Sequence, residues 1–137
     1  ALSEGSIANA LKMSSPDYQA IRDDAIKLLE NAAHGNITEL WDWVSNASNN
    51  SEYANSFMVS LLSLMRDMFV VSSQSGSILN FDANSTILEC AKHVNSPEKA
   101  LQLFHEFERL RSELFRNPQY QLFYSAVAAT LAQTFIK

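Results

Sequence analysis

The sequence predicts an all-α protein, a bundle of about six to seven helices. Apolar residues recur at helical spacing along almost the whole chain. No segment alternates strictly between apolar and polar residues with turn residues at both ends, as a half-buried strand would. Only three glycines and three prolines interrupt the 137 residues. Helices joined by such short connections pack as a bundle.

The first half of the chain is expected to form four helices, at residues 6–13, 15–34, 38–47 and 51–73. The second opens with Pro16, which is tolerated in a first turn, and ends at Gly35, which suits a left-handed C-cap. Trp41 and Trp43 face different ways on the third helix, so one should be buried and the other should lie at an edge. The fourth helix is apolar on more than one side, which is typical of a central helix or of one that faces a partner.

Three more helices are expected after a connection at residues 74–82. They cover residues 85–93, 96–115 and 118–135. Ser96-Pro97-Glu98 repeats the start signal of the second helix, since serine caps, proline fits the first turn and an acid complements the positive helix end. Asn117 precedes a proline and therefore avoids the helical region, which separates the last two helices.

Composition limits the class of partner and the compartment. The formal net charge of −5 gives no general attraction to nucleic acids or anionic lipids. Apolar residues around position 65–71 are interrupted by Arg66 and Asp67, so we expect no membrane span. The single cysteine, Cys90, excludes an internal disulfide and fits a reducing cytoplasm, and we expect it to be a buried apolar residue.

No pattern of residues indicates catalysis, a cofactor or a metal ion. The three glycines are isolated, so no glycine-rich phosphate loop can form. His34, His93 and His105 lack metal-ligand spacing. Asp23 and Asp24 are adjacent on a helix and face different ways, as on a solvated face. We therefore expect no catalytic residue and no small-molecule ligand.

Arg66 and Asp67 form the most informative charged pair, because they interrupt the most apolar helix. Unpaired burial of such groups is costly, so they must reach an edge or find partners. Two interpretations stay open, a polar contact at an interface and a solvent-facing stripe of the helix.

Four segments resemble motifs of one protein family, in the same order along the chain. They are Leu2–Leu11, Leu64–Phe69, Ile78–Asp82, and Asn117 followed by Gln121-Leu122. In that order they resemble the helix that ends an AAA+ lid domain, an apolar helix with a basic–acidic break, an asparagine-x-aspartate turn, and the start of a last helix. The chain thus resembles the C-terminal collar domain of the delta-prime subunit of the bacterial DNA polymerase III clamp loader.

The resemblance implies a division of the chain and a set of partners. Residues 1–14 would end the preceding AAA+ lid domain, and residues 15–137 would form the helical collar domain. Family collar domains assemble with the delta and gamma/tau subunits into a hetero-pentamer, which supports sliding-clamp loading in DNA replication and meets DNA and the clamp only indirectly. The parent assembly belongs to a DNA-directed DNA polymerase, a nucleotidyltransferase, although this segment carries no catalytic site.

Two alternatives remain, from the same family and from another class. ATP-hydrolysing gamma/tau subunits carry a phosphate-sensing arginine three residues after the glycine of the first motif, where this chain has Ala8. The collar of a gamma/tau subunit is therefore the less favoured alternative. A small helical enzyme or ligand-binding domain is the other, although no titratable residues cluster in an apolar setting.

Counting apolar faces suggests where a partner would bind. One core uses one face of each helix, and large exposed apolar patches are uncommon on monomers. We therefore expect an interface formed by the helices at 51–73, 96–115 and 118–135. Arg66 and Asp67 would lie at its polar edge, and Tyr124 would anchor it, since aromatic and arginine residues dominate interface energetics.

We predict that the chain does not bind ATP. It has no glycine-rich loop to hold phosphates, and Ala8 cannot contact them. Isothermal titration calorimetry of the purified chain with ATP and Mg²⁺ should show no saturable heat. Saturable binding in the micromolar range would contradict this expectation.

Overall fold

The computed structural model describes residues 16–136, and this part of the chain is entirely helical apart from its connections. The helices are α2 (Pro16–Ala33), α3 (Ile37–Asn46), α4 (Ser51–Ser73), α5 (Asn84–Val94), α6 (Pro97–Arg116) and α7 (Tyr120–Phe135), with a short 3-10 helix η1 (Phe81–Ala83) before α5. The predicted all-α class is confirmed, and each boundary lies within about two residues of its prediction. The expected helix at 6–13, the lid segment at 1–14 and Ala8 lie outside the described residues.

Local capping explains why the helices begin and end where they do. Asn50 accepts a hydrogen bond from the Tyr53 amide at the start of α4, and Ser96 does the same for Lys99 at the start of α6. Gly35 has a φ of 78°, and the next amide returns to the Asn31 carbonyl to close α2. Gln74 closes α4 in the same way with a φ of 54°.

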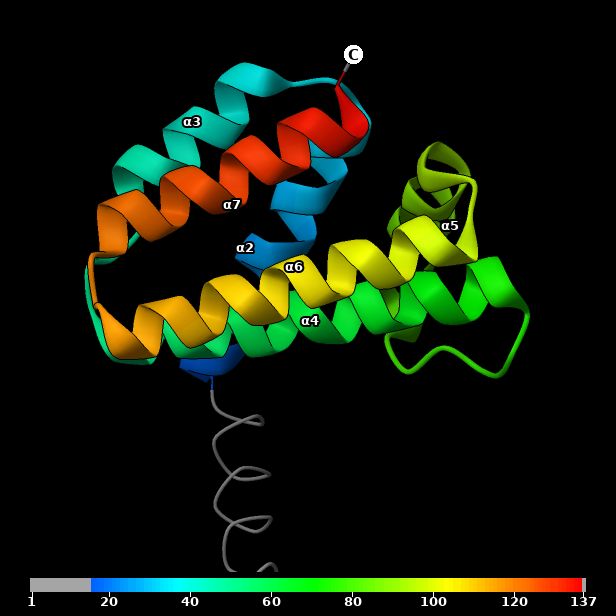
Figure 1. Ribbon diagram of the computed structural model, residues 1–137, viewed down its shortest axis with the longest axis horizontal. Helices are drawn as coiled ribbons and strands as arrows, with labels where there is room; N and C mark the ends of the chain where they lie inside the picture. The colour runs from blue at the N-terminus through cyan, green and yellow to red at the C-terminus, as the bar shows by residue number, and fades with distance from the viewer. Residues whose placement is uncertain (1–15, 137) are drawn as a thin grey trace, which may run out of the picture.

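The helices form two antiparallel pairs joined by α2. In Figure 1, α4 and α6 lie side by side and run in opposite directions, and α3 lies beside α7. α2 contacts α3, α4, α5 and α7, so it connects the two pairs. α5 packs against α4 and α2 at the end of α4 where the chain turns into the 74–80 connection.

α4 is the central helix of the bundle. It packs against α2, α5 and α6, and twelve of its 23 residues are buried. By length and composition it is the one helix between residues 16 and 136 that could cross a membrane, but 56% of its most apolar window is buried among the other helices. Its central place in the core accounts for apolar residues on more than one side.

The large apolar side chains that stay exposed lie elsewhere. They are Ile37 and Trp41 on α3, Leu79 and Phe81 in the segment before α5, Leu88 on α5, Leu101 and Phe115 on α6, and Leu122 on α7. Trp41 is exposed whereas Trp43 packs against the core, as expected from their spacing. Of the three helices expected to form an interface, α6 and α7 have exposed large apolar side chains, whereas the apolar faces of α4 pack against other helices of the bundle.

Candidate functional site

The segment after α4 turns back along the helix that it has just left. Gln74 in the left-handed conformation reverses the chain, and the Ser75 amide donates to the Val70 carbonyl. Ser73 donates its hydroxyl to the Phe69 carbonyl and contacts the Ser75 hydroxyl. This compact turn brings residues 77–80 beside the middle of α4, where Asp67 lies.

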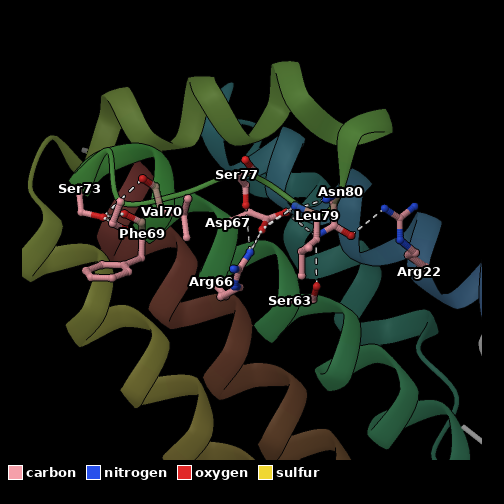
Figure 2. A network of polar contacts seen from close by, with 11 residues as sticks. Arg22, Ser63, Arg66, Asp67, Phe69, Val70, Ser73, Ser77, Leu79 and Asn80 are labelled. Carbon is pink, nitrogen blue, oxygen red and sulfur yellow. Dashed lines mark hydrogen bonds and ion pairs between the residues drawn. The ribbon is translucent and has the colours of Figure 1, made fainter. Parts of the chain in front are cut away.

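Asp67 is a fully buried carboxylate that binds this segment. Both of its oxygens accept from the Leu79 amide at 3.0 Å, and Oδ2 accepts from the Asn80 amide at 2.8 Å. The Asn80 side-chain amide donates to Oδ2 at 2.6 Å, and Arg66 Nη1 donates to Oδ1 at 2.8 Å. Figure 2 shows these donors converging on the carboxylate from the loop and from the neighbouring residue of α4.

Asn80 extends the network from α4 to α2. Its amide nitrogen also donates to the Ser63 hydroxyl at 3.1 Å, one helical turn before Asp67. Its carbonyl oxygen accepts from Arg22 Nη2 at 2.9 Å. Arg22 in turn forms a two-pronged ion pair with Asp82, at 2.7 and 2.8 Å. The Asn80 side-chain amide therefore links α4 to Arg22 of α2, and Arg22 extends this network to Asp82 of η1.

The electrostatics of this network favour ionised carboxylates. Burial opposes ionisation of Asp67, but hydrogen bonds from the Leu79 amide, both Asn80 nitrogens and Arg66 outweigh it and lower the pKa of Asp67. The hydrogen bond from Arg22 lowers the pKa of Asp82, and Asp82 raises the pKa of Arg22. The charges are thus paired, as buried charges must be.

The Asp67 network has no side chain that is free to react, and the backbone that it holds carries apolar side chains into solvent. Asp67 is 0% exposed and its oxygens are occupied by donors, so it cannot act as a base toward a solute. The backbone that it holds carries two apolar side chains outward, because Leu79 is 66% exposed and Phe81 is 74% exposed. Arg66, with 43% of its side chain exposed, donates to the same Asp67 carboxylate that accepts from the Leu79 amide. We call Arg66, Leu79 and Phe81 the Phe81 surface.

The structure corrects two expectations about the predicted interface residues. Asp67 lies neither at a polar edge nor on a solvent-facing stripe, because its whole side chain is enclosed by the 77–80 segment. Tyr124 cannot anchor a partner in this structure, since its ring is fully buried and its hydroxyl donates to the Ser48 carbonyl at 2.6 Å. Of the three residues, Arg66 alone is accessible to a partner.

Tyr124 belongs to an aromatic cluster between α3, α4 and α7. Trp43 stacks on Phe57 and meets the Tyr124 ring edge to face, with centroids 4.6 and 5.1 Å apart. Trp43 donates to the Tyr53 hydroxyl at 3.1 Å, which donates to Asp24 at 2.9 Å. Burial raises the pKa of Tyr53, and Asp24 adds to this effect. Asp24 is thus a half-buried acceptor, whereas its neighbour Asp23 is exposed as expected.

Elsewhere between residues 16 and 136, histidine pairs only with single glutamates, as His34 does with Glu89 and His105 with Glu108. No three of the His, Cys, Asp and Glu residues in this range lie close enough to hold a metal ion. Cys90 is 1% exposed, as expected of a buried apolar residue, and burial raises the pKa of its thiol to about 12. Such a thiol is not a nucleophile at neutral pH.

Arg22 is the member of the network that the sequence did not reveal. It precedes Asp23 and Asp24 on α2, where a charged residue is expected to face solvent. Its partners Asn80 and Asp82 are about sixty positions away along the chain. The asparagine-x-aspartate turn was noted as a motif, but nothing in the local sequence pairs it with Arg22.

Comparison with known proteins gave no match among protein-family models, curated proteins or solved structures.

We predict that Asp67→Asn lowers the free energy of unfolding by about 2–4 kcal/mol, since an amide would direct its own hydrogens at the donors that Asp67 accepts from. Urea denaturation at pH 7 measures this change. Asp42→Asn is the matched control, because Asp42 is exposed on α3 and its carboxylate has no hydrogen-bond or ion-pair partner between residues 16 and 136. The control should change stability by less than about 0.5 kcal/mol. Equal effects of the two substitutions would contradict the structural role of Asp67.

The same substitution should flatten the acid dependence of stability. A carboxylate whose pKa is lowered by folding stabilises the protein fully above its unfolded pKa of about 3.9, and this contribution is lost as the pH falls through the folded pKa. The stability difference between wild type and Asp67→Asn should therefore shrink as the pH falls below about 4. Urea titrations at several pH values test this, and a difference that stays constant to about pH 2 would contradict it.

Proposed function

We propose that this chain is a protein–protein assembly module, the collar domain of a delta-prime-type clamp-loader subunit. It would join delta and gamma/tau subunits in a hetero-pentamer that supports sliding-clamp loading in the cytoplasm. It contributes contacts and no catalysis, so DNA and the clamp are reached through its partners.

One observation carries the proposal. Two of the four motifs that underlie the resemblance, Leu64–Phe69 and Ile78–Asp82, are direct hydrogen-bonding partners through Asp67 and Asn80. The side chains that define the two motifs, Asp67 and Asn80, are the ones that bond to each other. Here the basic–acidic break and the asparagine-x-aspartate turn form one network, which supports reading them together as the signature of one fold.

The Phe81 surface is the part of the network that a partner can reach. A segment whose backbone amides donate to Asp67 loses little further conformational freedom on binding, so the entropy cost of ordering opposes contacts through Leu79 and Phe81 less. Arg66 adds a partly exposed charged group that is bound to the same Asp67 carboxylate as this segment. A buried aromatic anchor with an arginine at its border is typical of the residues that dominate interfaces.

Arg66 itself is a poor probe of assembly. It donates to the buried Asp67 carboxylate and to the Ser77 carbonyl. Arg66→Glu would place a second negative charge beside Asp67 and destabilise the loop, so a loss of assembly would have two causes. Phe81 is the cleaner site, since most of its side chain is in solvent.

We predict that Phe81→Ala weakens assembly about tenfold while changing the free energy of unfolding by less than about 0.5 kcal/mol. The full-length subunit would be co-expressed with the delta and gamma/tau subunits of the same organism, and recovery in the complex measured by affinity capture and titration.

Trp41→Ala is the matched control, since Trp41 is also a partly exposed aromatic residue but lies on α3. It should enter the complex with unchanged affinity. If wild-type protein does not join the complex, the proposed family is wrong. If wild type and Phe81→Ala join equally well, the family stands and the Phe81 surface is not an interface.

A further inference from the structure

A mainly apolar cavity lies between the start of α4, the end of α6 and the start of α7. Its volume is about 270 Å³, and its apolar wall is formed by Ala54, Leu114, Phe115, Pro118 and Tyr120. Arg111 also lines it. Asn55 and Asp67 are twelve positions apart on α4, which places this cavity about 18 Å along the helix from the Asp67 network.

Arg111 is the unusual residue of this cavity. Its Nε atom is buried and has no hydrogen-bond partner, and Nη2 donates to Asn55 Oδ1 at 3.0 Å. The Phe115 ring lies over the guanidinium, 5.6 Å from Cζ to the ring centroid. Its neighbours Arg109 and Arg116 on α6 both pair with glutamates, whereas Arg111 has no ion pair between residues 16 and 136. Arg111 as a whole is partly exposed, so its guanidinium carries a charge that no acidic residue between positions 16 and 136 compensates, while the enclosed Nε atom lacks an acceptor.

The chemistry of the cavity defines what would satisfy it. An anion would compensate the Arg111 charge, and a planar carboxylate suits a guanidinium best. The apolar wall requires an apolar group joined to that anion. The cavity is smaller than the pockets of about 300–1,000 Å³ that usually hold whole small-molecule ligands, so one large side chain fits it better than a metabolite.

We propose that the Arg111 cavity binds a peptide segment of a partner protein in which a large apolar side chain stands beside a carboxylate. The apolar side chain fills the cavity, and the carboxylate pairs with Arg111. Charge disfavours a second copy of this chain as the occupant, since two molecules of formal charge −5 repel each other. The cavity uses none of the residues of the Phe81 surface, so its test is separate from the test of the proposed function.

The test is a titration of the ¹⁵N-labelled 137-residue protein with three capped dipeptides, followed by NMR. N-acetyl-Asp-Phe-amide should bind saturably and shift the signals of Asn55, Arg111 and Tyr120. N-acetyl-Asn-Phe-amide has the same shape without the charge and should bind about fivefold more weakly. N-acetyl-Asp-Ala-amide lacks the apolar group and should show no saturation. This comparison uses wild-type protein alone, so it does not depend on a variant that folds.

Arg111→Gln should abolish the preference for the aspartyl peptide, with Arg116→Gln as the control one turn further along α6, outside the cavity wall. Equal binding of the aspartyl and asparaginyl peptides to wild type would overturn the proposal. So would shifts confined to other helices, or no binding at all. Concentration-dependent shifts at Phe115 without peptide would identify a second copy as the occupant and would overturn it as well.

Discussion

The hydrogen-bonded burial of Asp67 is the constraint on which the remainder of the structure depends. A carboxylate without water is destabilising unless donors replace the lost solvation. The chain supplies those donors from Leu79, Asn80 and Arg66, which together outweigh the effect of burial on ionisation. Because two of these donors are backbone amides, one side chain holds residues 79–80 against α4, and together with the turn at Gln74 it sets the path of the chain between α4 and α5.

Several elements take their positions from this path. The 77–80 segment leads directly into η1 and α5, whose Ile87, Cys90 and Val94 face the common core. Asn80 uses its remaining acceptor for Arg22, so α2 is linked to the same point. Polar networks of this kind specify one arrangement when every member is satisfied. Helix α4 thus packs its apolar residues against α2, α5 and α6, and its one buried charge, Asp67, binds the segment that follows the helix.

Hydrogen bonding also explains why an aromatic residue that was expected at an interface is buried in the core. Tyr124 could enter the core because its hydroxyl reaches the Ser48 carbonyl in the connection before α4. Tyr53 and Trp43 are joined in a chain that ends at Asp24 on α2. Tyrosine and tryptophan are buried when their polar atoms find such partners. In contrast, the buried Nε atom of Arg111 has no acceptor between residues 16 and 136, and most of the Phe81 side chain is exposed.

The sequence by itself determined the helices of this protein, and the tertiary structure decided how its charged and aromatic residues are used. Helix periodicity, the cap at Ser96 and the left-handed Gly35 are local features, so the helix bounds could be predicted within about two residues. The opposite fates of Trp41 and Trp43 also follow from local geometry. The Asp67 loop contact, the Arg22 ion pair and the burial of Tyr124 join residues 12 to 76 positions apart. Such contacts depend on how the helices pack, and no periodicity in the chain encodes which partner a buried polar atom will meet.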